Sequence, residues 1–264
     1  MNEKKYYFTF KGILDRIKKE YYYYTFRPWS LINVGEFWDS VGDYDGVNSN
    51  IYPYYKRFEN SYDLAIKYLS KKKYNMLDIQ ARSGNGSLFW YNKNKINSVV
   101  CIDFSDYFVS LINKKLNETE LEYKCIKVSE FPIPINDSSF DFICTYETIE
   151  HIYDYNLFLK ELYRLLEDKG IVILTCPSVS WEWVHWLSAI ININHSEGPH
   201  RFIRRKKLIK AISTNGFNIL EENTTILLPF NNKLSILFDK FLEKTLPNFI
   251  TRALCLRRTF VLSK

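Results

Sequence analysis

Five short apolar stretches, separated by stretches of helical character, are the feature that most limits how this chain can fold. They read MLDI, SVVCIDF, YKCIKV, FDFICTY and IVILTCP. They are apolar along most of their length, as strands are when both faces of a sheet are covered. Helices are predicted between them, for instance near 86–93 and 106–117. This alternation predicts an α/β fold with a doubly wound, mostly parallel sheet.

Composition narrows the class of protein. The chain has 264 residues, 46% of them hydrophobic, and a net charge of +6. This suits one domain with elaborations and is too weakly basic to indicate a nucleic-acid partner. The five cysteines include no CxxC pair, and no signal peptide or eighteen-residue apolar run is present. We therefore expect reduced thiols and a cytoplasmic protein.

Polar residues follow the first two predicted strands, where an open α/β sheet binds its ligands. Asp78 leads into a turn with Gly84, which lacks a Cβ and so allows a ligand to approach the backbone. Asp103 follows nineteen residues later and could accept both hydroxyls of a ribose. Asp103 could instead cap the next helix, although Ser105 is better placed for that. Together the loop and the acid indicate a ribose-bearing cofactor.

Three segments resemble, in order, the motifs of class I S-adenosylmethionine (SAM)-dependent methyltransferases of the small-molecule, methyltransferase type 11-like group. They are MLDIQARSGNGS, VVCIDFS and the block from FPIPINDSSFDF to ILTCP. FWDSVGDYDG also resembles the family's N-terminal lid segment, and GPHRFIRRKKLIKAISTNGFNIL resembles its segment after the fifth strand, so the similarity runs from about Phe37 to Lys264. It implies a Rossmann-like, doubly wound sheet of seven strands, mostly parallel with an antiparallel last strand. It also implies S-adenosyl-L-methionine as the cofactor.

The resemblance implies cofactor contacts from residues that follow the first, second and fourth strands: Asp78, Gly84, Asp103, Phe104 and Tyr146. Asp78 would orient the methionine ammonium, Gly84 would admit the cofactor to the backbone, and Asp103 would bind the ribose hydroxyls.

The sequence departs from the family pattern at two places. Gln80 and Arg82 stand where the family usually has glycine. Their side chains could fill the space for the methionine end of the cofactor, or Arg82 could pair with the cofactor carboxylate. The acid that usually contacts adenine after the third strand is replaced by Ser129 and Glu130, either of which could make one contact.

The segment ETIEH, after the fourth strand, offers candidate catalytic residues. Glu147, Glu150 and His151 could converge and hold a divalent ion, with His195 or His200 completing the set. A similar pattern binds metal in the ubiquinone-pathway O-methyltransferases and in small-RNA 2′-O-methyltransferases. We favour a site without metal, in which His151 has a structural or proton-relay role.

Transfer to an oxygen needs a general base. His151 is our first candidate, followed by His200 and His185, with Glu147 bordering the substrate.

The expected organisation is a helical N-terminal lid over 1–60 and a methyltransferase domain over 61–264, with helical additions after the fifth strand and near the C-terminus. A helix is expected near 61–70 and an edge strand over 253–264. Trp181, Trp183 and Trp186 could line a substrate pocket or pack on the sheet. The basic, aromatic N-terminus and the tail from about residue 226 could contact a membrane peripherally, or could cover the sheet or a dimer interface.

These features support methyl transfer to a small-molecule or lipid-linked acceptor, with oxygen as the preferred acceptor atom. The alternative is a non-catalytic binding module of the same fold with a degenerate cofactor loop. RNA methylation with a metal is a weaker third hypothesis.

Overall fold

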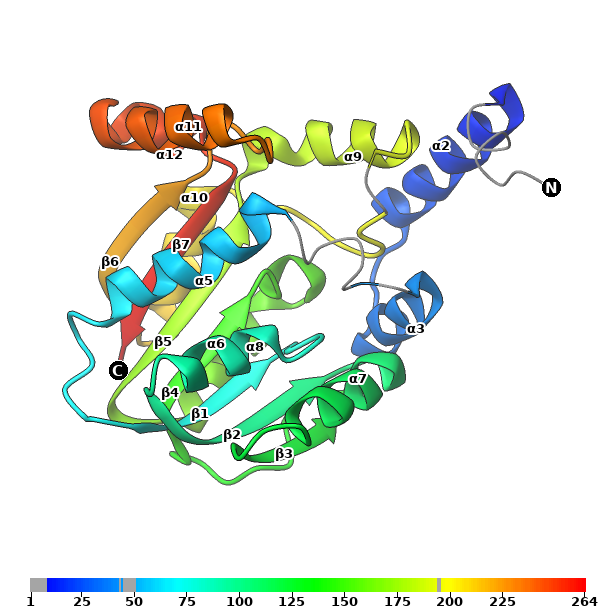
Figure 1. Ribbon diagram of the computed structural model, residues 1–264. Coiled ribbons are helices and arrows are strands. Elements are labelled where there is room, and N and C mark those ends of the chain that lie inside the picture. The colour runs from blue at the N-terminus through cyan, green and yellow to red at the C-terminus, as the bar shows by residue number, and fades with distance from the viewer. Residues whose placement is uncertain (1–8, 43, 45–50, 194–195) are drawn as a thin grey trace.

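The computed structural model describes residues 9–42, 44, 51–193 and 196–264, and its centre is a seven-stranded sheet of order β3-β2-β1-β4-β5-β7-β6 (Figure 1). The strands are β1 (Tyr74–Ile79), β2 (Ile96–Asp103), β3 (Glu122–Lys127), β4 (Phe140–Tyr146), β5 (Leu166–Pro177), β6 (Asn218–Thr225) and β7 (Arg257–Ser263). The first five are parallel, and β7 is antiparallel to both β5 and β6. The predicted fold class is therefore confirmed.

The edge position expected for the last strand is wrong. β7 lies between β5 and β6, and β6 forms the edge. The sequences explain the order: β7 is almost wholly buried, whereas β6 reads NILEENTT and leaves several polar side chains partly exposed. A strand whose polar side chains reach solvent tolerates an unpaired edge better than a strand that is buried on both faces.

Helices cover both faces of the sheet. One layer holds α5 (Tyr52–Ala65), α6 (Asn85–Asn92) and α7 (Asp106–Leu116), and the other holds α8 (Tyr155–Leu165) and α10 (Arg205–Thr214) (Figure 1). The helix expected near 61–70 begins earlier, because Pro53 fits the first turn of a helix, and α5 therefore runs across the expected boundary at residue 60.

The N-terminal helices α2 (Phe10–Thr25) and α3 (Leu31–Val41) precede this layer, and α3 lies over the loop that follows β2. A Cβ on Gly35 would be 2.1 Å from the Phe104 carbonyl oxygen, so the helix backbone rests directly on this loop. Asp39 accepts hydrogen bonds from Ser105 Oγ at 2.6 Å and from the Tyr107 amide at 3.0 Å. These contacts fix α3 above the carboxyl end of β2.

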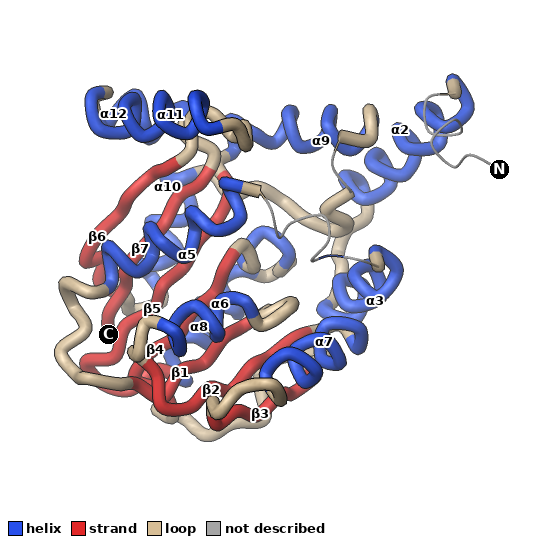
Figure 2. The backbone as a smooth tube through the Cα atoms, viewed as in Figure 1, coloured by secondary structure: helices blue, strands red, loops and turns tan. Residues whose placement is uncertain are grey.

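Three further helices lie at the same end of the molecule as the carboxyl ends of the parallel strands. Figure 2 shows α9 (Glu182–Ile190), α11 (Lys233–Thr245) and α12 (Asn248–Leu254) in a row that α2 continues. They include the helical additions expected after the fifth strand and near the C-terminus. Within the described residues, no helix combines the length and apolarity needed to cross a membrane.

Candidate functional site

The loop after β1 keeps a backbone that suits glycine although it carries larger residues. Gln80 and Arg82 have φ values of 55° and 53°, in the left-handed region, and Gly84 has φ 75°. A left-handed conformation costs a residue with a Cβ about 1–2 kcal/mol. Both side chains are nevertheless buried, with 2% and 7% of the residue surface exposed. The surrounding contacts must therefore hold the loop in this shape.

Arg82 turns inward across the carboxyl ends of the strands. Its Nη1 donates to the Tyr44 hydroxyl at 2.6 Å, and its Nη2 donates to the Glu147 carbonyl at 3.0 Å. The guanidinium carbon lies 4.9 Å from the ring centroid of Trp38 and 5.3 Å from that of Tyr44, within reach of a cation–π interaction. These contacts hold the Arg82 side chain between Trp38, Tyr44 and the loop that follows β4.

Asp103 is fully engaged with the backbone. One carboxylate oxygen accepts from the Arg82 amide at 2.8 Å, and the other accepts from the amides of Phe104 and Ser105 at 2.8 and 3.1 Å. The residue has no exposed surface, and burial raises its pKa to about 6. Ser105 caps α7 through the Phe108 amide, as the sequence favoured. Asp103 therefore ties two loops together beneath α3.

Asp78 borders a cavity of about 10 Å³, which it shares with Gln80 and Tyr146. A cavity of this size holds about one water molecule. The Asp78 carboxylate accepts a hydrogen bond from Ser87 Oγ at 2.7 Å, and burial raises its pKa to about 7. Neither polar atom of the Gln80 amide has a hydrogen-bond partner within the described structure. This cavity lies where the resemblance places the methionine ammonium.

The residues expected to bind SAM lie beneath other parts of the chain in this structure. Asp78, Gly84, Asp103, Phe104 and Tyr146 are all buried by the protein itself. Trp38 and Tyr44, which lie in the segment expected to form the N-terminal lid, pack on Arg82 and on Phe108 of α7. Ser129 and Glu130 are exposed and line neither this cavity nor the larger pocket described below.

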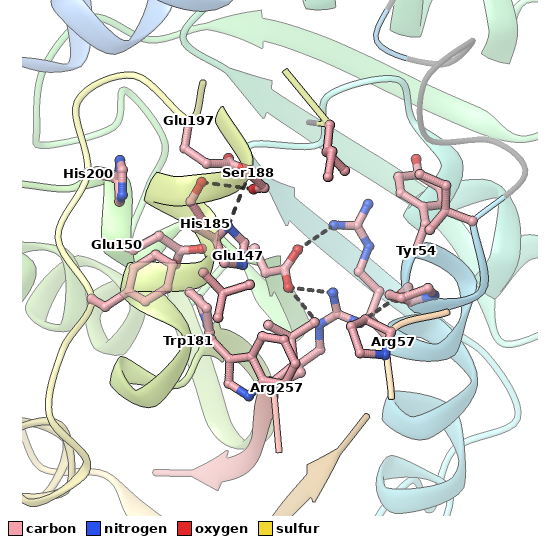
Figure 3. A pocket seen from close by; sticks show the side chains of 18 of the residues that line it. Tyr54, Arg57, Glu147, Glu150, Trp181, His185, Ser188, Glu197, His200 and Arg257 are labelled. Carbon is pink, nitrogen blue, oxygen red and sulfur yellow. Dashed lines mark hydrogen bonds and ion pairs between the residues drawn. The ribbon is translucent and has the colours of Figure 1, made fainter. Parts of the chain in front are cut away.

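A pocket of about 840 Å³ opens beside this closed region, at the carboxyl ends of β4 and β5. Figure 3 shows Arg57 and Arg257 converging on Glu147. Arg57 Nη1 donates to one Glu147 oxygen at 3.0 Å, and Arg257 Nε donates to the other at 2.6 Å. Burial opposes the charge of Glu147, but Arg257 and Arg57 together hold its pKa down to about 2. This ion cluster was not predicted, because its members lie far apart in the sequence.

The predicted catalytic residues Glu147, His151 and His200 line this same pocket, together with His185. Burial lowers the pKa of His151 to about 3, which makes it a weak base at neutral pH. Its Nδ1 lies 3.1 Å from the Pro199 carbonyl, so the neutral ring donates there and keeps Nε2 unprotonated.

A metal site is not formed by the side chains that are described. Glu147 is occupied by two arginines, and burial raises the pKa of Glu150 well above its ordinary value. No three His, Cys, Asp or Glu side chains within the described ranges gather as a ligand set. His195, which the sequence suggested as a further ligand, lies outside those ranges.

Sequence comparison bears on this architecture directly. A family model described as a methyltransferase domain matches residues 77–174, from β1 into β5. The chain therefore contains a class I SAM-dependent methyltransferase domain. This methyltransferase is 25% identical over 191 residues to an uncharacterised protein of Methanocaldococcus jannaschii, covering 70% of this chain and 74% of that one.

A second group of relatives matches a shorter part of the chain. The methyltransferase is 24% identical over 127 residues to a ubiquinone biosynthesis O-methyltransferase of Bradyrhizobium diazoefficiens, covering 45% of this chain and 48% of that one. It thus spans about half the length of the ubiquinone biosynthesis enzymes that it matches.

Solved structures share the fold of this methyltransferase at low identity. The [4+2]-cyclase SpnF has a TM-score of 0.67 and 14% identity, covering 89% of this chain and 97% of that one. Geranyl diphosphate C-methyltransferase from Streptomyces coelicolor A3(2) has a TM-score of 0.60 and 11% identity, covering 88% and 97%. One is a cyclase by name and the other a C-methyltransferase, so the likeness concerns the fold and does not select a reaction.

The buried Asp78 gives a pH-dependent prediction for this methyltransferase. Its pKa of about 7 in the fold exceeds the ordinary value of 3.8, so the folded state holds the proton more tightly than the unfolded state does. The cost of burying the carboxylate is absent well below pH 3.8, grows between pH 3.8 and 7, and is complete above pH 7. Asp78→Asn removes that cost. We compare the free energy of unfolding of Asp78→Asn with that of the unmodified chain. The difference in favour of the variant should be roughly 2 kcal/mol larger at pH 8 than at pH 5.

Urea denaturation at the two pH values measures this difference. The same substitution at Asp106, which is exposed, serves as the control. Identical pH dependence in Asp78→Asn and the unmodified chain would show that Asp78 is ionised in the fold without cost.

Proposed function

We propose that this methyltransferase transfers a methyl group to an oxygen of a small-molecule or lipid-linked acceptor held in the pocket above Glu147. The main support for the proposal is this pocket. The expected catalytic residues line it, and apolar side chains surround its opening. Its volume of about 840 Å³ is in the range of pockets that bind small organic ligands. Family membership supports methyl transfer, and the ubiquinone biosynthesis O-methyltransferases support oxygen as the acceptor atom.

The acceptor hydroxyl must lose a proton, and we assign its removal to His200. The low pKa of His151 argues against our first candidate, and burial also lowers the pKa of His185. His200 is partly exposed, and its Nδ1 lies 2.8 Å from the Gly198 carbonyl. The neutral ring then donates from Nδ1 and leaves Nε2 to receive a proton.

Cofactor binding requires a conformation other than the one described above. We propose that α3 acts as a lid and that α3 and the Arg82 side chain withdraw together before SAM can bind. Arg82 is in contact with Trp38 of this helix and with Tyr44 just beyond it, so movement of one disturbs the other.

The second candidate is a binding module of the same fold that does not transfer methyl groups. It is favoured by one observation, that Arg82 lies in the cofactor region and donates hydrogen bonds to Tyr44 and to the Glu147 carbonyl. Under this candidate the pocket above Glu147 binds a ligand while the cofactor region stays closed.

Calorimetry with SAM and S-adenosylhomocysteine separates the two candidates. The enzyme predicts binding of both, and it predicts that label from methyl-labelled SAM appears in an extractable acceptor. His200→Gln should then reduce the rate of labelling without weakening S-adenosylhomocysteine binding. The absence of binding at about millimolar ligand, corresponding to less than about 4 kcal/mol of affinity, would favour the binding module.

A further inference from the structure

Helix α11 presents an apolar stripe to solvent. Leu234, Leu237, Phe238 and Phe241 recur at helical spacing, with 78%, 66%, 52% and 58% of their surfaces exposed. Helices at the surface of a globular protein normally turn such a stripe toward the core. The orientation of α11 is therefore the reverse of the usual one.

Polar contacts on the inner side hold the helix in this orientation. Asp239 is fully buried and accepts hydrogen bonds from the amides of Leu227 and Leu228 at 2.7 and 2.9 Å, and from the Tyr52 hydroxyl at 3.0 Å. Glu243 accepts from the Ile226 amide at 2.6 Å. A buried carboxylate with three donors cannot rotate outward without losing them. The apolar stripe is thus fixed on the outside.

The neighbouring elements extend this apolar surface to the mouth of the pocket. Trp183 and Leu187 of α9 are 65% and 43% exposed, and Phe230, before α11, is 58% exposed. All three also line the pocket above Glu147. Phe249 of α12 adds a further aromatic ring, 73% exposed. Figure 2 shows the three helices in one row at this end of the molecule.

The exposed charges of α11 are basic. Lys233, Lys240 and Lys244 of α11 are exposed, whereas the two acids of that helix bond to the protein on its inner side. Aromatic and aliphatic side chains among lysines match the interface of a bilayer that contains anionic lipid. An acidic protein surface would satisfy the lysines but would not require so continuous an apolar stripe.

We propose that α9, α11 and α12 dock on an anionic phospholipid bilayer, with the pocket mouth at the membrane surface. An amphiphilic acceptor would then pass from the bilayer along Trp183, Leu187 and Phe230, and its polar group would reach the floor at Glu147. The docking itself stands on the exposed stripe and its charge. The route for the acceptor rests on the function proposed above.

Vesicle flotation tests the docking. The unmodified protein should float with vesicles of phosphatidylcholine and phosphatidylglycerol and much less with phosphatidylcholine alone. The triple variant Leu237→Ser, Phe238→Ser, Phe241→Ser should lose roughly tenfold or more of its binding, since each of these side chains contributes apolar burial. Lys240→Glu with Lys244→Glu should weaken binding to the anionic vesicles alone. Leu157→Ser, on α8 and 46% exposed, is the matched control and should float unchanged.

Other outcomes overturn the proposal. Equal flotation of the triple variant and the control would mean that α11 does not contact lipid. Concentration-dependent dimerisation that the triple variant abolishes, without flotation of the unmodified protein, would assign the surface to a second copy of the chain. S-adenosylhomocysteine binding, measured without vesicles, reports on the proposed function separately: a protein that floats but does not bind it keeps the docking surface and loses the enzymatic role.

Discussion

Replacement of Glu147 by Gln is expected to lower the free energy of unfolding by about 3–5 kcal/mol, the usual cost of breaking a buried ion cluster. Arg57 and Arg257 have 4% and 5% of their side chains exposed and share Glu147 as their carboxylate partner. A neutral amide of the same size keeps the packing but leaves two guanidinium groups facing each other without a counter-charge. Urea or thermal denaturation at pH 7 measures the loss.

Glu221→Gln is the control, because Glu221 pairs with Lys67 at the exposed edge strand, where 52% of the lysine side chain is accessible. An exposed pair of this kind contributes about 0–1 kcal/mol. Equal losses from the two substitutions would contradict the picture of Glu147 as the anchor of the pocket floor.

Glu147 also makes the free energy of unfolding depend on pH. The pKa of Glu147 is about 2 in the fold and 4.5 ordinarily, so the folded state releases the proton more readily. Its stabilising contribution is complete above pH 4.5 and is lost as the pH falls toward 2. The unmodified chain should therefore lose its advantage over Glu147→Gln across this acid range.

The sheet could be predicted from the sequence because apolar runs are local signals. MLDI, FDFICTY and the other strand sequences report burial within a few residues, and they correctly placed the parallel core. The position of β7 in the sheet was harder to predict, because an apolar strand sequence indicates burial but does not indicate which strands lie on either side. The partly polar β6 was the available sign that another strand had to form the edge.

The site was predictable only in part, for the same physical reason. Glu147, His151 and His200 line one pocket, and this followed from their place after the fourth strand and near the fifth. Arg57 and Arg257 reach Glu147 from elements 90 and 110 residues away along the chain. An N-terminal lid was expected, but its contacts with Arg82 through Trp38 and Tyr44 depend on how α3 docks, which no local pattern in the sequence reports. Two local signs, Gln80 with Arg82 and Ser129 with Glu130, showed that the cofactor region departs from the family pattern.

The Gln80→Gly/Arg82→Gly variant is expected to bind S-adenosylhomocysteine about tenfold to a hundredfold more tightly than the unmodified chain. If the closed conformation competes with the ligand, the apparent Kd is the intrinsic value divided by the open fraction, and a weaker closed state raises that fraction. Glycine accepts φ near 55° without strain, and the amide of residue 82 can still donate to Asp103. What is lost is the guanidinium contact with Tyr44, Trp38 and the Glu147 carbonyl.

Calorimetry of the two single variants shows which side chain closes the region. Arg82→Gly should account for most of the gain, because Gln80 borders only the cavity of about 10 Å³ whereas Arg82 makes the bonds that link the loop to Tyr44. Arg164→Gly, which removes an arginine bonded to Glu161 and Asp137 on the other face of the sheet, controls for general loosening of the fold. Should the double variant bind no better than this control, the docking of α3 alone would be sufficient to exclude the cofactor. The binding module would then account for the chain better than the enzyme does.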